Sequence, residues 1–280
     1  MNELDKIPCV IEGGYNTSYI TSLLSALFYK ENEHLKSILL QQPNNKSGYY
    51  LQDIIKVNYI EPMRKHYTIK SDILNEIRNY LFINGFLPNE NILNTFKIQS
   101  ISDLYLFLSE YLNSQKMEFD ITKIKDGKLI ETDNLHKLSM IELKVNNKNT
   151  SIRELFLNWI SSVLLKEQEE YYCYKLKDIP SYLCFHLKRD KQEENVMVDI
   201  MNKIKFFKNS DPTQNYIKYK IHSLICFDGK NYYTCMIGYN NKWIMLNENI
   251  IPSMHYISMA DDDITEKIKK EVMFIIYTLD

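Results

Sequence analysis

Apolar residues recur at three- and four-residue intervals between positions 20 and 28, in the order Ile20, Leu23, Leu24, Leu27, Phe28. This spacing predicts an amphipathic helix with one face toward the core. The helix follows the pair Gly13-Gly14, which suits a tight turn, and any residue from 16 to 18 could cap it. The pattern therefore places Ser18 at or near a helix N-terminus.

The same periodicity predicts three further helices. One begins near Ser71 and ends at Asn84-Gly85, and another covers about 101–112. A fourth opens at Ser151, where the spacing to Glu154 fits a capping box. Its expected apolar face consists of Ile152, Leu155, Phe156, Trp159 and Val163.

After residue 180 the pattern changes to runs of β-forming residues. We expect strands at 183–187, 216–227, 232–239, 242–246 and 272–277. Asp228-Gly229 is typical of a hairpin turn, and the acidic run 261–263 is expected in a solvated loop. The elements predict an α+β fold with helices first and an antiparallel sheet afterwards.

Composition narrows the class of protein. The chain has 280 residues, 45% hydrophobic content and a formal net charge of -2 with both signs interspersed, so no basic surface argues for nucleic acid. Its five cysteines include no C-x-x-C pair, which gives no indication of zinc and favours a reducing, intracellular compartment. No leader segment and no apolar run of about 20 residues is present, so we expect no membrane partner.

Several segments, taken in order, resemble motifs of the ubiquitin-specific protease family. Residues 16–24 (NTSYITSLL) resemble its Cys box N-T-C-Y-M-N-S-x-L, and residues 179–189 (IPSYLCFHLKR) resemble L-P-x-x-L-x-x-H-L-K-R. Residues 231–237 (NYYTCMI) resemble G-H-Y-T-A-Y-V, and residues 243–251 (WIMLNENII) resemble W-Y-x-F-D-D-x-x-V. The resemblance spans nearly the whole chain and implies a papain-like fold with an N-terminal helical thumb, a C-terminal antiparallel-sheet palm and reduced fingers without zinc. It implies one domain over 1–280, with the thumb at 1–115 and the palm and fingers at 116–280.

The family's catalytic positions fall on altered residues here. A cysteine protease needs a thiolate, a histidine base, a residue that orients the histidine, and donors for the oxyanion. Ser18 stands at the nucleophile, Tyr232 at the base, Asn247 at the orienting residue and Gly13 at the oxyanion side chain. A tyrosine is protonated at neutral pH and cannot take the proton, so the site is predicted to be inactive.

Three histidines bear on the prediction that the site is inactive. His222 and His255 lie nearest in sequence to the His box and are the candidates for a substitute base, while His186 is interpreted as a satisfied core histidine. Simpler interpretations of the altered positions are that Ser18 is only a helix cap and that Tyr232 packs the sheet. The resemblance implies a cleft for the Gly-Gly tail of ubiquitin, with contacts from three residues: Asp103, Asn231 and Tyr233.

Three functions remain open. The first is a ubiquitin-specific-protease-like pseudoenzyme that binds ubiquitin, a ubiquitin-like protein or an assembly partner without cofactor. The second is an active deubiquitinase with non-standard catalytic residues. The third is a structural component of a virion or another large complex, for which the high content of tyrosine (21 residues) would suit contact surfaces. The Asn-, Lys-, Ile- and Tyr-rich composition is common in AT-rich genomes, including those of large DNA viruses. We expect an intracellular, cytoplasmic location (the host cytoplasm or the virion for a viral protein) and make no prediction of oligomeric state.

Overall fold

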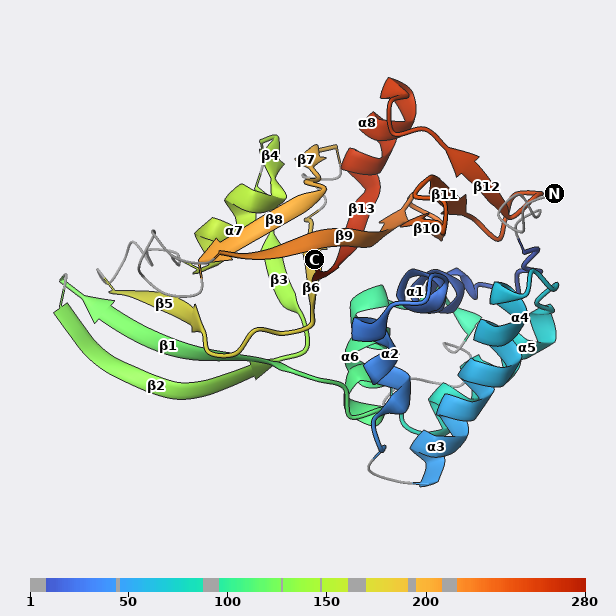
Figure 1. Ribbon diagram of the computed structural model, residues 1–280, viewed down its shortest axis with the longest axis horizontal. Coiled ribbons are helices and arrows are strands. Elements are labelled where there is room, and N and C mark those ends of the chain that lie inside the picture. The colour runs from blue at the N-terminus through green and yellow to red at the C-terminus, as the bar shows by residue number, and fades with distance from the viewer. Residues whose placement is uncertain are drawn as a thin grey trace.

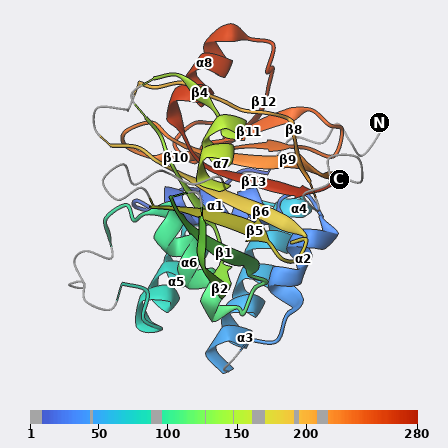
Figure 2. The same ribbon diagram turned by 90° about the vertical axis from the view of Figure 1, so that its left-hand side faces the viewer.

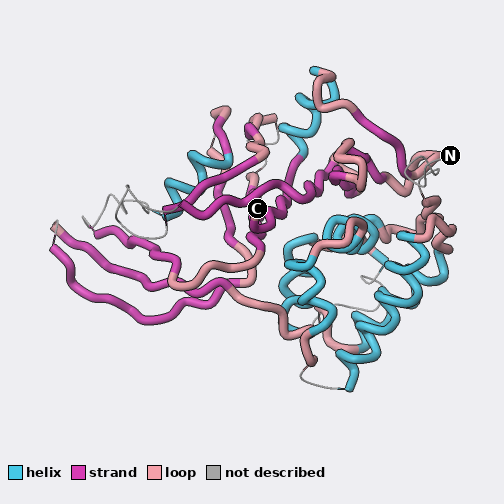
Figure 3. The backbone as a smooth tube through the Cα atoms, in the orientation of Figure 1, coloured by secondary structure: helices cyan, strands magenta, loops and turns pink. Residues whose placement is uncertain are grey.

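A helical half and a β-rich half form the molecule (Figure 1, Figure 3). The computed structural model describes residues 9–43, 46–87, 96–126, 128–146, 148–160, 170–190, 195–207 and 216–280. The first half contains α1 (Ser18–Phe28), α2 (Glu33–Leu40), α3 (Lys46–Asp53), the π-helix η2 (Ile54–Ile60), α4 (Glu61–Arg64), α5 (Ser71–Ile83) and α6 (Ile101–Tyr111). The predicted helices at 71–83 and 101–112 are therefore confirmed to within a residue.

The β-rich half holds most of the strands in one sheet. The strands are β1 (Met117–Lys125), β2 (Lys128–Leu138), β3 (Ile141–Lys144), β4 (Thr150–Ser151), β5 (Glu170–Leu176), β6 (Tyr182–Lys188), β7 (Val198–Asp199), β8 (Lys203–Phe207), β9 (Tyr216–Phe227), β10 (Tyr232–Ile237), β11 (Trp243–Leu246), β12 (Met254–Ile257) and β13 (Val272–Leu279). The eight-stranded sheet has the order β12-β11-β10-β9-β13-β6-β3, with β8 also paired to β9. A three-stranded sheet, β2-β1-β5, extends away from the body (Figure 1).

Two features of this half differ from the sequence prediction. The large sheet is not antiparallel throughout, because β3 pairs with β6 in parallel. The acidic run 261–263 is not a loop: Asp261 is the N-cap of α8 (Asp262–Glu271), and its carboxylate accepts the backbone N–H groups of Asp263 and Ile264 at 3.1 and 3.2 Å. Negative charge is favourable at a helix N-terminus, so the aspartates start a helix here.

The helix α1 lies between the sheet and the other helices (Figure 2), and all of its residues are buried. Hydrogen bonds join it to elements on both sides, although the Tyr19 and Ser22 hydroxyls are buried without a partner. The Thr234 hydroxyl on β10 donates to the Ser22 carbonyl at 2.9 Å. On the opposite side, the Tyr59 phenol is 2.7 Å from the Ser25 hydroxyl and donates to the Thr21 carbonyl at 3.1 Å. These bonds fix the helix that carries Ser18 relative to the sheet.

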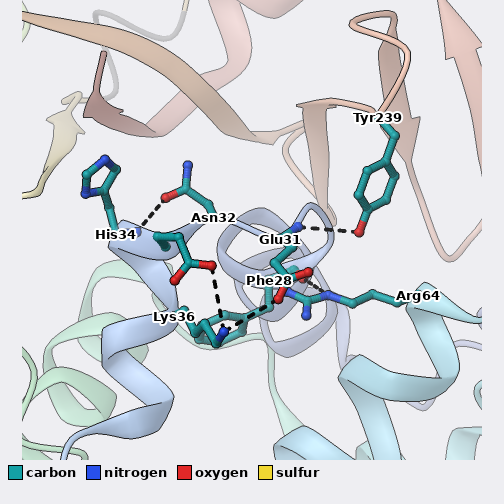
Figure 4. A network of polar contacts seen from close by, with 8 residues as sticks. Phe28, Glu31, Asn32, His34, Lys36, Arg64 and Tyr239 are labelled. Atoms are coloured by element: carbon teal, nitrogen blue, oxygen red, sulfur yellow. Dashed lines mark hydrogen bonds and ion pairs between the residues drawn. The ribbon is translucent and has the colours of Figure 1, made fainter.

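The C-terminal end of α1 is tied to three other elements (Figure 4). The Arg64 guanidinium donates to the Phe28 carbonyl at 2.9 Å, which satisfies one of the last carbonyls of the helix. The Glu31 backbone N–H donates to the Tyr239 hydroxyl of the β10–β11 turn at 3.4 Å. Asn32 then caps α2 by accepting backbone N–H groups of its first turn.

The helix α7 (Ile152–Ile160) covers the junction between the two sheets. Trp159 contacts Phe119 of β1 at 5.2 Å between ring centroids and stacks on Tyr174 of β5 at 4.5 Å. Its cap differs from the predicted box: Ser151 accepts the Glu154 N–H at 3.2 Å, while the Glu154 carboxylate bonds to the hydroxyl of Thr150 at 3.0 Å.

The apolar face predicted for this helix can be checked at the residues that the structure describes. The expected apolar face is buried at Ile152, Leu155 and Phe156. Val163 lies outside the described residues.

No helix in the described part of the chain has both the length and the apolar character needed to cross a bilayer.

Candidate functional site

Ser18 is the first residue of α1, and the cap before it is Thr17. The interpretation of Ser18 as a helix cap is therefore wrong by one position. Thr17 donates its own hydroxyl elsewhere and accepts the Gly14 N–H at 2.9 Å, which closes the loop in front of the helix. The left-handed residue of that loop is Asn16 (φ 55), not either glycine. Gly14 is needed for close approach instead, because a Cβ there would lie 2.8 Å from the Thr17 methyl.

The fold brings Ser18 and Tyr232 together from distant parts of the sequence. The Tyr232 backbone N–H, at the start of β10, donates to the Ser18 Oγ at 3.1 Å. Ser18 is 0% exposed and Tyr232 is 8% exposed. The serine oxygen is therefore occupied as an acceptor of a backbone donor and has no contact with solvent.

The Tyr232 side chain points to the N-terminus of α6. Its hydroxyl accepts the Ile101 backbone N–H at 3.4 Å, and its ring packs against Phe227 at 4.8 Å between centroids. Burial raises the pKa of the Tyr232 phenol, and the nearby Asp103 carboxylate adds to this, against the lowering effect of the Ile101 N–H. The phenol is thus held in its neutral form, which cannot act as a general base.

Asn247 is engaged with its own loop. It is 8% exposed, and its amide oxygen accepts the backbone N–H of Asn249 at 3.0 Å. Its backbone N–H donates to the Ser253 carbonyl at 2.8 Å and its carbonyl accepts the Ile250 N–H at 3.2 Å. These bonds define the turn that follows β11, so Asn247 shapes the loop that carries its neighbour Glu248.

Glu248 fills the space beside Gly13. A Cβ built on Gly13 would lie 3.1 Å from the Glu248 Cγ and 3.2 Å from its Cβ and carboxyl carbon. A side chain at position 13 would therefore require Glu248 to move. The two residues were not linked by the sequence, which gave Gly13 only as an altered oxyanion position.

The Glu248 carboxylate is held against the first turn of α1. The Thr21 hydroxyl donates to it at 2.5 Å, and the Thr17 hydroxyl lies 3.2 and 3.4 Å from its two oxygens. Burial raises the pKa of the Glu248 carboxyl, and the hydroxyls of Thr21 and Thr17 oppose that rise. The signal for this residue was available in the sequence, because it stands at the second acidic position of the W-Y-x-F-D-D pattern.

The three predicted tail contacts do not share one surface. Tyr233 is buried on the other face of the sheet, where its hydroxyl donates to Glu271 at 2.8 Å. Side chains alternate along a strand, and the Tyr232 side chain faces the N-terminus of α6, so Tyr233 faces away from it. The prediction that Tyr233 lines the cleft is therefore wrong. Asn231 stands in the β9–β10 turn, where its N–H donates to Asp228 at 2.7 Å, and Asp103 is exposed on the first turn of α6.

The histidines considered as substitute bases lie elsewhere. His222 is 6% exposed on β9, beside the Ala26 carbonyl near the far end of α1 from Ser18. Burial lowers the pKa of its imidazole to about 4. His255 is on β12, opposite Met245. His186, which was interpreted as a satisfied core histidine, is not one, since its buried Nδ1 lacks a hydrogen-bond partner and lies 3.7 Å from the Glu142 carboxylate.

Metal-binding side chains do not gather in the described part of the chain. No group of three or more His, Cys, Asp or Glu residues there is arranged to hold a metal ion. The buried cysteines Cys9, Cys184, Cys226 and Cys235 are free thiols. Burial raises the pKa of both the Cys9 and the Cys184 thiols to about 12, which makes each a poor nucleophile at neutral pH.

A helical half packed on a mixed sheet, with Ser18 and Tyr232 meeting at the junction, resembles the fold of ubiquitin-specific-protease-like deubiquitinases. One similar solved structure is a chain of the SAGA DUB module of Ubp8, Sgf11, Sus1 and Sgf73 bound to monoubiquitin, with a TM-score of 0.69 and 13% identity over 100% of this chain and 70% of that chain. Another is a chain of the same module bound to ubiquitin aldehyde, with a TM-score of 0.68 and 12% identity over 100% of this chain and 71% of that one. No protein-family model matches the sequence, and no curated protein matches it. At these identities the likeness establishes the fold alone.

Proposed function

We propose that this protein binds ubiquitin or a ubiquitin-like protein through the Ser18 site and does not cleave it. The observation that carries the proposal is the pair Ser18 and Tyr232, joined at 3.1 Å through the Tyr232 backbone. By the motif resemblance they stand at the positions of a thiolate and an imidazole base, and they supply neither.

The chemistry of proton transfer argues against a rescued serine nucleophile. A serine hydroxyl attacks only when a base within hydrogen-bond reach accepts its proton. Tyr232 is a neutral phenol turned toward α6, and His222 lies near the other end of α1 with a pKa lowered to about 4. Ser18 is also 0% exposed, so a substrate carbonyl has no path to its oxygen in this conformation.

The oxyanion position argues in the same direction. Acyl transfer develops negative charge on the carbonyl oxygen, which active enzymes stabilise with donors aimed at that point. Beside Gly13 this chain has the Glu248 side chain, whose carboxylate is held by Thr17 and Thr21. Because the family pattern is also acidic at the position of Glu248, the departure lies at Gly13, which has no side-chain donor for the developing charge.

Retention of the fold supports a binding role. We assign the helices α1 to α6 to a thumb, the eight-stranded sheet to a palm, and β1, β2 and β5 to reduced fingers, all within one domain over 1–280. The two similar solved structures are complexes with monoubiquitin and with ubiquitin aldehyde. A ligand of that kind is the partner that we propose for this chain.

A titration of isotope-labelled ubiquitin with the unmodified chain, followed by NMR, tests binding. We expect the largest shift changes in the C-terminal tail of ubiquitin. Absence of any change up to millimolar protein would contradict the proposal and favour a structural role in an assembly.

Restoring the catalytic groups tests whether the positions are equivalent to those of the active enzymes. Gly13→Asn would press against the Glu248 side chain, so the restored chain combines Gly13→Asn, Ser18→Cys, Tyr232→His and Glu248→Ala. We expect this chain to be captured by ubiquitin with a C-terminal electrophile. The same chain with the thiol one turn further along α1, at Ser22→Cys instead of Ser18→Cys, should not be captured. Equal capture of both would show that the reaction is not specific to position 18.

A further inference from the structure

Glu248 places a carboxylate at the surface of the site. Gly13 is exposed and Glu248 is half-buried, whereas Ser18 behind them is fully buried. A ligand that enters from solvent therefore meets Gly13 and Glu248 before it meets Ser18. The carboxylate cannot swing freely, because the hydroxyls of Thr21 and Thr17 hold it at 2.5 and 3.2 Å.

Four hydrogen-bond donors of the site are already engaged. The Gly14 N–H bonds to Thr17 at 2.9 Å, and the Tyr232 N–H bonds to Ser18 at 3.1 Å. The Thr17 and Thr21 hydroxyls both donate to the Glu248 carboxylate. What the site offers an incoming ligand at Glu248 is an acceptor that carries negative charge.

The environment of Glu248 already opposes charge. Burial raises the pKa of its carboxyl, and only the two threonine hydroxyls act against that rise. A second carboxylate brought into contact would add direct repulsion at a site that solvent screens poorly. A peptide amide brought to the same place is neutral, and its N–H can donate to a free lone pair of Glu248.

We propose that Glu248 makes the site selective for a ubiquitin-like tail that continues as an amide over the same tail ending in a free carboxylate. The partner is then the conjugated form, in which the terminal glycine is joined to an amine, and not the free form. This inference rests on the proposed function and adds which chemical form of the partner is bound.

Calorimetric titration of the unmodified chain with two ligands provides the test: ubiquitin with its natural C-terminal carboxylate, and ubiquitin converted to the C-terminal amide. We expect the amide form to bind roughly tenfold or more tightly, which is the scale of a like-charge contact in a partly buried site. Glu248→Gln keeps the shape of the side chain and removes its charge, so the two affinities should converge, mainly through tighter binding of the free form. Glu266→Gln makes the same change on the exposed face of α8 and should leave the ratio unchanged.

The outcomes separate the two proposals. Equal affinities of the unmodified chain for the amide and the carboxylate would overturn the role of Glu248 and leave the binding function standing. A ratio that persists in Glu248→Gln would also overturn that role. Absence of binding by either form would overturn the proposed function itself, and the selectivity with it.

Discussion

His222 gives the structure a sensitivity to acid that can be measured directly. The imidazole belongs to β9 and is buried beside the end of α1. The Lys30 and Lys220 ammonium groups lie close enough to disfavour its positive charge. Burial is the largest cause of the lowering of its pKa to about 4, followed by Lys30, while the Ala26 carbonyl acts the other way. The folded protein therefore keeps this histidine neutral at pH values where an unfolded chain would protonate it.

The sign and size follow from proton linkage. An exposed histidine has a pKa near ~6.5, so below that pH the unfolded state binds the proton first and the free energy of unfolding falls as the pH falls. The loss continues until the folded state protonates at about pH 4. With these two pKa values, the histidine lowers the free energy of unfolding by about 2 kcal/mol at pH 5 relative to neutral pH.

Urea unfolding of the unmodified chain and of His222→Gln, at pH 7.5 and pH 5, isolates this contribution. The substitution itself lowers the free energy of unfolding at both pH values, because it replaces a buried ring. The comparison therefore uses the change with pH in each protein. We expect the unmodified chain to lose about 2 kcal/mol more than the variant between the two conditions. Equal losses of the free energy of unfolding in the two proteins would contradict this prediction. So would an NMR titration of the His222 ring with its midpoint above pH 6.

Three further predictions concern the elements that hold the site. Tyr59→Phe removes the hydroxyl that contacts Ser25 and the α1 backbone, so the free energy of unfolding should fall by about 1–3 kcal/mol in urea titrations, and an unchanged midpoint would contradict that support. Phe274→Ala empties a fully buried position that packs on Tyr105 at 5.1 Å, so a loss of about 3–5 kcal/mol is expected; a loss under 1 kcal/mol would mean that the core is not packed there. Asp261→Ala deletes the cap of α8 and should cost about 1 kcal/mol, whereas amide exchange in the first turn of α8 as slow as in the unmodified protein would refute that role.

The local elements could be predicted wherever one periodicity dominates the sequence. The helix at 71–83 and the strand at 216–227 begin and end close to the predicted residues, because a single apolar pattern and a clear stop signal define each. The run 261–263 was misinterpreted because its charge suggested a solvated loop. The same aspartates complement a helix N-terminus, and Ile264 and Ile268, which follow them, pack the helix against the core.

The site could be predicted in outline from the family resemblance but not in its detail. The motifs placed Ser18 and Tyr232 together. Because adjacent side chains on a strand point to opposite faces, assigning Tyr232 to the site would also have predicted that Tyr233 lies on the other face. The contact between Glu248 and Gly13 could not be predicted, because it joins a loop after β11 to a loop before α1. Only the packing of the helix on the sheet brings those two loops together.

The most direct test of the central claim is to incubate the unmodified chain with ubiquitin conjugates under conditions in which NMR detects ubiquitin binding. We expect that ubiquitin binds and that no cleavage product accumulates above the level given by a Ser18→Ala variant. Cleavage by the unmodified chain that disappears in Ser18→Ala would contradict it, because Ser18 would then be an activated nucleophile.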